Sequence, residues 1–345
     1  MDSASRGARR LRPGGRALAK LRTIADEMSA IEDTYVVPAA AAPTRPNERL
    51  KGILFLCAGA FIFTFQDIII KLVSGRYPLS EVLAIRCVVA VPLLLVLVHF
   101  DGGLGGLLTR RWSLLLLRAV LLLVCYSCYY LAIAAIPLAE AVPLYYTAPL
   151  FIVLLSGPVL GERVGLGRWI AVVVGFAGVV VADSRGASSA IVLAVGSAAF
   201  YGLAQVMARR LGVTERASVM TFFHNLVFLA AATVMALLTG DGSYDDGGNA
   251  SLQFLLRPWT TPTLFDFAII AATGFIAALG SFCLTHAYRI AEANVVAPFE
   301  FTSIIWAVIG GLVVWGYVPD AAMITGALLI VAAGVYVLTS SRQPR

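Results

Sequence analysis

The sequence predicts an all-α integral membrane protein of ten transmembrane helices, arranged as two inverted five-helix repeats. Ten mostly apolar stretches follow one another from Lys51 to Thr339, with short polar breaks between them. Each is about as long as the roughly 20 residues that an α-helix needs to cross a bilayer. Only 13% of the residues are charged and the mean hydropathy is +0.86. A water-soluble protein would lack the hydrophilic surface to cover so much apolar chain.

Proline, glycine and charged residues mark the limits of the helices. The stretches before and after them are predicted as tails. Residues 1–49 are Arg-rich and then rich in Ala and Pro, which buries too little surface to fold alone, so they are expected to form a disordered basic tail. Met28 is an alternative start, and residues 341–345 form a C-terminal tail. The predicted spans are 51–74, 80–99, 112–135, 140–160, 167–182, 188–208, 217–239, 264–287, 294–315 and 321–340.

Two segments of the chain resemble each other and predict an internal repeat. Residues 138–181 begin L-A-E-A-V-P-L-Y-Y-T-A-P-L-F, and residues 290–337 begin I-A-E-A-N-V-V-A-P-F-E-F. Both contain A-E-A early and A-G-V late. We therefore divide the chain into repeats at 50–183 and 187–340. Because five crossings is an odd number, the two copies are expected to lie in the membrane with opposite orientation.

Arginine in the loops predicts the orientation, because cytoplasmic loops are enriched in Lys and Arg. Alternate loops carry eight arginines against three, which places both termini in the cytoplasm. The loop 240–263 is then expected outside. The richer set is Arg110, Arg111, Arg163, Arg168, Arg209, Arg210, Arg216 and Arg289, and the poorer set is Arg76, Arg185 and Arg257.

Composition excludes several kinds of function. Ten of the 26 Lys and Arg residues lie in residues 1–51, so the net charge of +6 indicates a membrane-facing tail, and no nucleic-acid partner is predicted. All five cysteines fall inside apolar stretches, which favours packing over disulfides. Cys125-x-x-Cys128 lacks a second pair, so no metal and no cofactor are predicted.

The chain lacks sequence motifs typical of several other functional classes. The chain contains no G-x-x-x-x-G-K-[ST] phosphate loop and no H-E-x-x-H zinc motif. The longest internal loop has about two dozen residues, too few for a folded receptor domain. An enzyme or a receptor without transport is therefore the weaker interpretation, and a carrier driven by an ion or solute gradient is the stronger one.

Several motifs resemble one family over about residues 51–340. They are I-R-C-V-V-A (Ile85 to Ala90), F-Y-G-L-A-Q-V-M-A-R-R (Phe200 to Arg210), A-Y-R-I-A-E-A-N-V-V-A-P-F-E-F-T-S-I-I-W (Ala287 to Trp306) and Gly161-Glu162. In this order they are similar to the EamA-type branch of the drug/metabolite transporter superfamily. The resemblance implies a ten-helix bundle that carries small metabolites. Gly316-Tyr317 departs from the pattern, because a second Gly-Glu is expected there.

Charged residues inside the predicted helices are the first site candidates, since such residues are costly in a bilayer and often functional. Asp67 and Lys71 share a face of the first helix, and Arg86 lies at a similar depth in the second. One hypothesis is that Asp67 pairs with Arg86 or Lys71 as a structural tie between the helices. The other is that Arg86 or Asp67 binds a substrate charge or a coupling proton. Glu300 follows Pro298 in the ninth helix, where it is expected to bind a cation, relay a proton or bond to a tyrosine.

Aromatic and polar residues complete the set of candidates. Tyrosines suit flat aromatic or cationic solutes, although they also form belts at membrane interfaces. A titrating histidine would suit proton coupling. The further candidates for substrate binding or coupling are Tyr126, Tyr130, Tyr146, Tyr201, Gln205, His286 and Trp306.

The resulting expectation is a secondary active transporter of the cytoplasmic (inner) membrane that moves a small metabolite by alternating access. The A-Y-R-I-A-E-A-N stretch resembles bacterial riboflavin and S-adenosylmethionine carriers, so uptake of such a compound is preferred. Export of amino acids or drugs is the alternative. The expected partners are the small-molecule substrate and the lipid bilayer, and a homodimer is left open.

Overall fold

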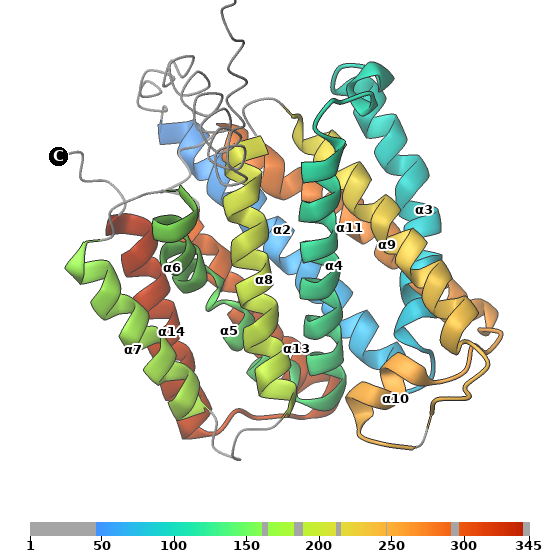
Figure 1. Cartoon of the computed structure of the whole chain (residues 1–345). Helices are drawn as coiled ribbons and strands as arrows, with labels where there is room; N and C mark the ends of the chain where they lie inside the picture. The colour runs from blue at the N-terminus through green and yellow to red at the C-terminus, as the bar shows by residue number, and fades with distance from the viewer. Residues whose placement is uncertain are drawn as a thin grey trace, which may run out of the picture. The chain divides into compact units, whose positions relative to one another are not determined.

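Every regular element that the structure describes is a helix. The computed structural model describes residues 46–160, 165–182, 189–211, 215–245, 247–290 and 297–340 (Figure 1). The predicted tails, apart from residues 46–49, lie outside these ranges, so their predicted disorder stays a prediction.

The helices lie where the apolar stretches predict them. Within the described ranges, nine helical segments are long and apolar enough to cross a membrane, and the apolar helix α7 is shorter, with 17 residues. This confirms the all-α membrane class. The uninterrupted long helices are α2 (Pro46–Val73), α3 (Leu79–Phe100), α4 (Trp112–Ala135), α8 (Ser189–Leu211), α9 (Ala217–Thr239), α11 (Leu264–Ile290) and α14 (Ala321–Ser340), and the shorter α7 is Leu166–Ala182.

The fourth predicted span, 140–160, is present as a membrane-length segment, Leu138–Leu155, but its helix is interrupted. It consists of α5 (Leu138–Tyr145) and α6 (Ala148–Leu160). Pro149 has no N–H and cannot donate to the carbonyl of Tyr145 four residues earlier. At the interruption, the hydroxyl of Thr147 donates a hydrogen bond to the carbonyl oxygen of Leu144 at 2.7 Å.

The ninth helix also changes character at its start. The 3₁₀ helix η2 (Ala297–Phe301) precedes α13 (Thr302–Trp315), while the predicted start at 294 lies outside the described residues. Glu300 therefore lies in a tight 3₁₀ turn rather than a turn and a half into an α-helix.

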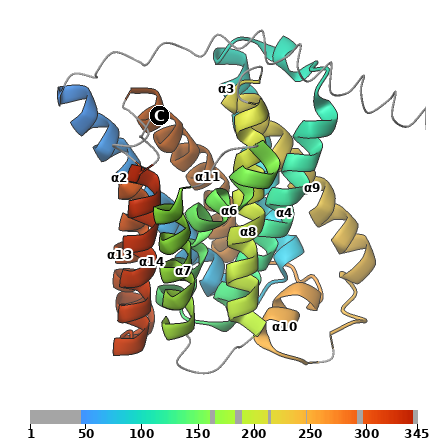
Figure 2. The same ribbon diagram turned by 60° about the vertical axis from the view of Figure 1, so that its left-hand side comes forward.

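Two short helices were not predicted. The 3₁₀ helix η1 (Leu104–Leu107) follows α3, and α10 (Ala250–Leu256) lies within the loop that precedes α11. The side chain of Asn249 accepts a hydrogen bond from the backbone N–H of Leu252 and so caps α10. Phe254 of α10 is fully buried. The helix α10 lies at the end of the bundle opposite the α3–α4 connection (Figures 1 and 2).

The long helices pack in pairs that are far apart in sequence. Helix α2 packs along α11, α4 along α8, α3 along α9, and α7 along α14 (Figures 1 and 2). The α7–α14 pair depends on glycine, because a Cβ at Gly326 would lie 2.5 Å from the carbonyl oxygen of Gly178. The apolar faces that remain exposed suit lipid.

Candidate functional site

A cavity of about 440 Å³, lined by both polar and apolar side chains, lies within the bundle. Its walls come from α2, α4, α5, α6, α8, α11, η2, α13 and α14, so both predicted repeats contribute. Leu56, Leu284 and Leu338 place it toward the end of the bundle where α2 begins and α14 ends. The polar lining residues are Thr64, Gln66, Asp67, Tyr126, Tyr129, Tyr145, Tyr146, Tyr201, Gln205, Glu300 and Ser303.

Asp67 lines the cavity from α2 and is held by α4. Its Oδ2 accepts a hydrogen bond of 2.8 Å from the hydroxyl of Tyr129. Arg86 of α3 instead donates through Nη1 to the hydroxyl oxygen of Tyr130, also at 2.8 Å. Among the described residues no ion pair joins Asp67 to Arg86 or to Lys71, so the expected pairing is wrong. Of the two adjacent tyrosines, Tyr129 thus bonds to Asp67 and Tyr130 to Arg86.

Lys71 stabilises the end of α4 rather than pairing with Asp67. Its ammonium group donates to the carbonyl oxygens of Ile133 and, at 2.7 Å, Ile136. Ile133 needs such a donor, because the residue four positions later is Pro137, which has no N–H. The positive charge also suits the negative end of the α4 dipole and lies 5.7 Å from the ring centre of Trp315.

Five tyrosines give the cavity an aromatic wall. The ring of Tyr145 lies between three others, with centroid distances of 4.9 Å to Tyr129, 5.7 Å to Tyr146 and 5.4 Å to Tyr201. The fifth, Tyr126, stacks against the ring of His224, with 5.8 Å between the ring centroids and 9° between the ring planes. Such rings offer faces for a flat solute or a cation, and hydroxyls for hydrogen bonds.

Both interrupted helices meet the cavity at their breaks. Tyr146 and Pro149 line it where α5 gives way to α6, and Glu300 lines it from η2 before α13 begins. The hydroxyl of Tyr146 donates to Oγ of Ser303 at 2.8 Å and so joins the two breaks directly. Irregular backbone at membrane depth is tolerated where it lines a cavity, which fits this position.

The structure brings together six of the ten residues that the sequence singled out. Three others lie apart from the cavity or behind its wall. Arg86 and Tyr130 are buried behind it, and Trp306 packs edge-on against Phe61 at 5.1 Å. The side chain of His286 lies outside the described residues. The six that line the cavity are Asp67, Tyr126, Tyr146, Tyr201, Gln205 and Glu300.

Thr64 and Gln66 line the cavity but were missed by the sequence analysis. Both are polar residues in an apolar helix, on either side of the face that carries Asp67. Polar side chains are rare in such a helix, and this rarity could have identified both residues as site candidates, as it did the charged residues.

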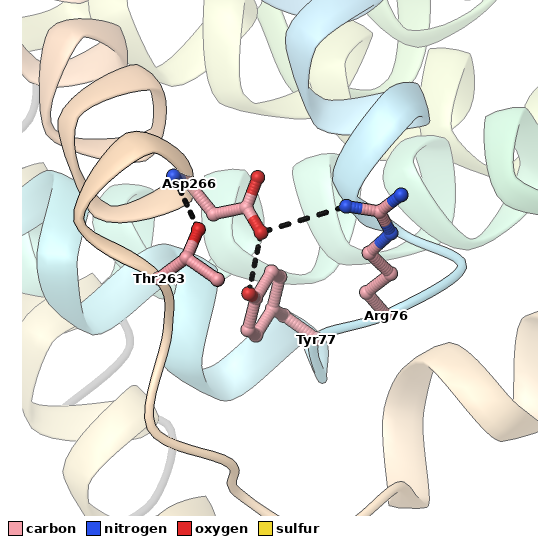
Figure 3. A network of polar contacts seen from close by, with 4 residues as sticks. All are labelled: Arg76, Tyr77, Thr263 and Asp266. Carbon is pink, nitrogen blue, oxygen red and sulfur yellow. Dashed lines mark hydrogen bonds and ion pairs between the residues drawn. The ribbon is translucent and has the colours of Figure 1, made fainter.

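The end of the bundle near α10 is joined by polar contacts. The hydroxyl of Tyr77, between α2 and α3, donates to Asp266 of α11 at 2.7 Å, and Arg76 approaches the same carboxylate at 3.6 Å (Figure 3). Thr263 caps α11 by accepting from the backbone N–H of Asp266 at 3.1 Å. The hydrogen bond to Asp266 raises the pKa of Tyr77, because an ionised phenol could not donate.

Further contacts close the same end. The hydroxyl of Tyr317, after α13, donates to Oε1 of Glu140 in α5. Arg257 donates to the carbonyl oxygen of Ser74 at 3.1 Å, and the indole of Trp259 donates to Ser80 at 2.8 Å. The loop that carries α10 is thereby attached to the α2–α3 turn.

No group of His, Cys, Asp and Glu suited to a metal ion occurs within the described part of the chain. All five cysteines are free thiols. The fold and the cavity thus define a multi-pass helical membrane protein with a cavity that polar, aromatic and aliphatic side chains line.

Comparisons with known proteins identify the family. The sequence pattern of the EamA-like transporter family matches residues 50–182. The chain is 30% identical over 287 residues to the pseudopaline exporter of Pseudomonas aeruginosa, covering 82% of this chain and 94% of that protein. A riboflavin transporter of Vibrio cholerae is 25% identical, covering 84% and 93%. An S-adenosylmethionine uptake transporter of Rickettsia prowazekii is 23% identical, covering 85% and 94%.

A solved crystal structure supports the fold, with a TM-score of 0.57 at 20% identity over 84% of this chain and 98% of that one. The chain belongs to the EamA-like transporter family, as its motifs predicted. It is a multi-pass membrane transporter, and not an enzyme.

Proposed function

We propose that the chain is a secondary active transporter that moves a small cationic or aromatic metabolite across the cytoplasmic membrane by alternating access. The observation that carries the proposal is the cavity wall. Among the described lining residues, two are carboxylates, five are tyrosines, and none is Lys, Arg or His. In a bilayer a lone charge costs about 2.5–3.5 kcal/mol on insertion scales. A cation that enters this chamber gains both negative charge and ring faces.

Packing supports the two inverted repeats, 50–183 and 187–340. If α2, α3, α4 and α7 correspond to α8, α9, α11 and α14, the most extensively packed pairs of these helices have counterparts. The α2–α11 pair then matches α8–α4, and the α3–α11 pair matches α9–α4. The α3–α9 and α7–α14 pairs each consist of two corresponding helices, one from each repeat. A twofold axis between the repeats would therefore map each of these pairs onto itself. Helices α2 and α8 run in opposite directions (Figure 1).

The interrupted helices support the same arrangement. Discontinuous helices at corresponding positions of two repeats are a recurrent sign of a transport site. Here α5–α6 is the fourth helix of one repeat, and η2–α13 is the fourth of the other. Both breaks line the cavity, and Tyr146 and Ser303 connect them.

Polar contacts join the helices at one end of the bundle. The contacts of Lys71, Tyr77 and Tyr317 lie at the end near α10, whereas the cavity extends toward the opposite end. With the termini in the cytoplasm, as the arginine count predicts, this conformation is closed to the outside. Alternating access then requires these contacts to separate.

The acidic wall favours an S-adenosylmethionine-like compound over a riboflavin-like one, because S-adenosylmethionine carries a sulfonium and an ammonium group. The named relatives include uptake transporters and an exporter, so export of an amino acid or a drug is the alternative.

Counterflow into proteoliposomes tests the proposal. Proteoliposomes that contain the purified protein are loaded with unlabelled S-adenosylmethionine, riboflavin or an amino-acid mixture. Entry of the same compound in labelled form is then followed. We expect exchange of S-adenosylmethionine, and at least a tenfold lower exchange in Glu300→Gln, since the lost charge is worth over 1.4 kcal/mol. Glu48→Gln, the same change at an exposed position in α2, is the matched control.

Two results would contradict the proposal. Unchanged exchange in Glu300→Gln would remove Glu300 from the site. Exchange of none of the three by the wild type would refute the substrate class.

A further inference from the structure

The carboxyl group of Asp67 borders the cavity with one hydrogen-bond donor and no counter-ion. Asp67 is partly buried and lines the cavity from α2. Its Oδ2 accepts from the hydroxyl of Tyr129 at 2.8 Å. Among the described residues, no other hydrogen bond and no ion pair involves this side chain. Oδ1 is therefore the oxygen that can gain or lose a proton.

The two cations nearest to Asp67 in the bundle are bound to other groups. Lys71, one turn further along α2, donates to backbone carbonyl oxygens at the end of α4. Arg86 donates to Tyr130, and it attracts Asp67 electrostatically without forming an ion pair. A charge without a partner is costly within a bilayer, and a proton on the carboxylate removes that cost. We therefore expect Asp67 to hold a proton while the cavity is empty.

No other charged group among the described residues neutralises Asp67. Helix α2 packs against α4, α5, α11, α13 and η2. Glu300 of η2 adds a second carboxylate to the cavity, whereas Glu140 of α5 and Asp266 of α11 accept from tyrosines near α10. Helix α13 has no titratable side chain, and Arg118 of α4 lies about three turns before Tyr129. The phenols that interact electrostatically with Asp67, uncharged near neutral pH, are Tyr129, Tyr130 and Tyr146.

We propose that the carboxyl group of Asp67 binds a coupling proton that the cationic cargo displaces, so that the protein exchanges one proton for one cargo molecule. This inference rests on the proposed function and names its driving ion. As the cargo enters, the O–H bond of the carboxyl group breaks, the proton passes to water in the cavity, and the carboxylate pairs with the cation. The hydroxyl of Tyr129 can donate to Oδ2 in both states.

This exchange also sets a direction for transport. Asp67 pairs either with a proton or with the cargo, so the charge within the bilayer is compensated in both states. Where the outside is the more acidic side, protons entering through the site drive the cargo outward. The proposal therefore favours export of the cationic compound.

Infrared difference spectra of the purified full-length protein test whether Asp67 holds a proton. At neutral pH without cargo, wild type minus Asp67→Asn is expected to contain the carbonyl band of a protonated carboxylic acid. Glu48→Gln removes an exposed carboxylate of α2, so this matched control is expected to show only the bands of the ionised form. Ionised bands in the Asp67 difference would overturn the proposal.

Asp67→Glu serves where Asp67→Asn does not fold. It keeps the carboxyl group and is expected to shift the protonated band rather than remove it. A band that does not shift belongs to another residue and would overturn the assignment to Asp67.

A pH gradient across proteoliposomes tests the coupling in the wild type. S-adenosylmethionine carries a net single positive charge, so its exchange for one proton is electroneutral. Vesicles about one pH unit more acidic inside are expected to accumulate it about tenfold, because the concentration ratios of proton and cargo become equal. An ionophore that exchanges protons for potassium is expected to abolish the accumulation.

The two proposals fail in different ways. Counterflow of S-adenosylmethionine without accumulation in the pH gradient would overturn the coupling and leave the proposed function standing. If the wild type exchanges none of the compounds tested for the proposed function, methylammonium is added to the infrared sample instead. Loss of the protonated band of Asp67 on addition supports displacement of the proton by a cation, and persistence of the band overturns it.

Discussion

Replacing Lys71 by methionine tests whether this intramembrane cation stabilises α4 or contacts the substrate. Its ammonium group donates to the carbonyl oxygens of Ile133 and Ile136, at the position where Pro137 leaves the helix without a donor. Methionine has a similar length and no charge. The variant therefore removes both hydrogen bonds without leaving a large cavity.

The expected loss follows from opposing contributions. A hydrogen bond with a charged partner contributes about 1.5–3 kcal/mol, so the two contribute roughly 3–6 kcal/mol. Placing a lysine within the bilayer costs about 2.5–3.5 kcal/mol, and methionine avoids that cost. The net destabilisation is therefore about 1.5 kcal/mol. For a chain of this length, that corresponds to a Tm lowered by roughly 2 °C.

Thermal unfolding in detergent, followed by tryptophan fluorescence, measures the change. Lys71→Arg keeps donors for both carbonyls and is expected to unfold close to the wild type. Lys51→Met, the same substitution at an exposed position of α2, is the matched control. An unchanged Tm for Lys71→Met would refute this reasoning. A raised KM with an unchanged Tm would assign Lys71 to the substrate instead.

Two further predictions concern the end of the bundle near α10. The pKa of Tyr77 is raised in the folded protein, so the stability from its bond to Asp266 is complete below about pH 10 and is lost as pH rises further. The Tm difference between wild type and Tyr77→Phe is thus expected to shrink above pH 10, and a constant difference would contradict it. Ser243 is exposed in the loop before α10, so a membrane-impermeant maleimide is expected to label Ser243→Cys in intact cells. Labelling only after permeabilisation would reverse the predicted topology.

The sequence predicted most helix limits to within a few residues. The predicted spans 112–135 and 217–239 coincide with α4 and α9. Hydropathy succeeds here because lipid requires every spanning segment to satisfy its own backbone. It failed at α5–α6 and at η2, where Pro149 and Pro298 lie inside apolar runs. Whether a proline bends a helix or ends it depends on what its neighbours supply.

The scarcity of charge in the apolar stretches pointed to Asp67 and Glu300, and both line the cavity. The partners of these charges were not predictable in the same way. Asp67 and Arg86 lie at similar depth, yet the intervening face of α4 places Tyr129 against one and Tyr130 against the other. That outcome depends on how α4 is rotated about its axis, which hydropathy does not encode.

The chain by itself determined the solvent, the approximate helices and the rare polar residues, since each follows from the cost of placing charge or unpaired backbone in lipid. Its motifs, by resemblance, indicated the family. The tertiary structure alone decided which of those residues meet. It turned Lys71 toward the end of α4, placed Trp306 against Phe61, and brought Asp67 and Glu300 to one tyrosine-lined cavity. Contacts between helices depend on their rotation and register, and these are fixed only when all the helices pack together.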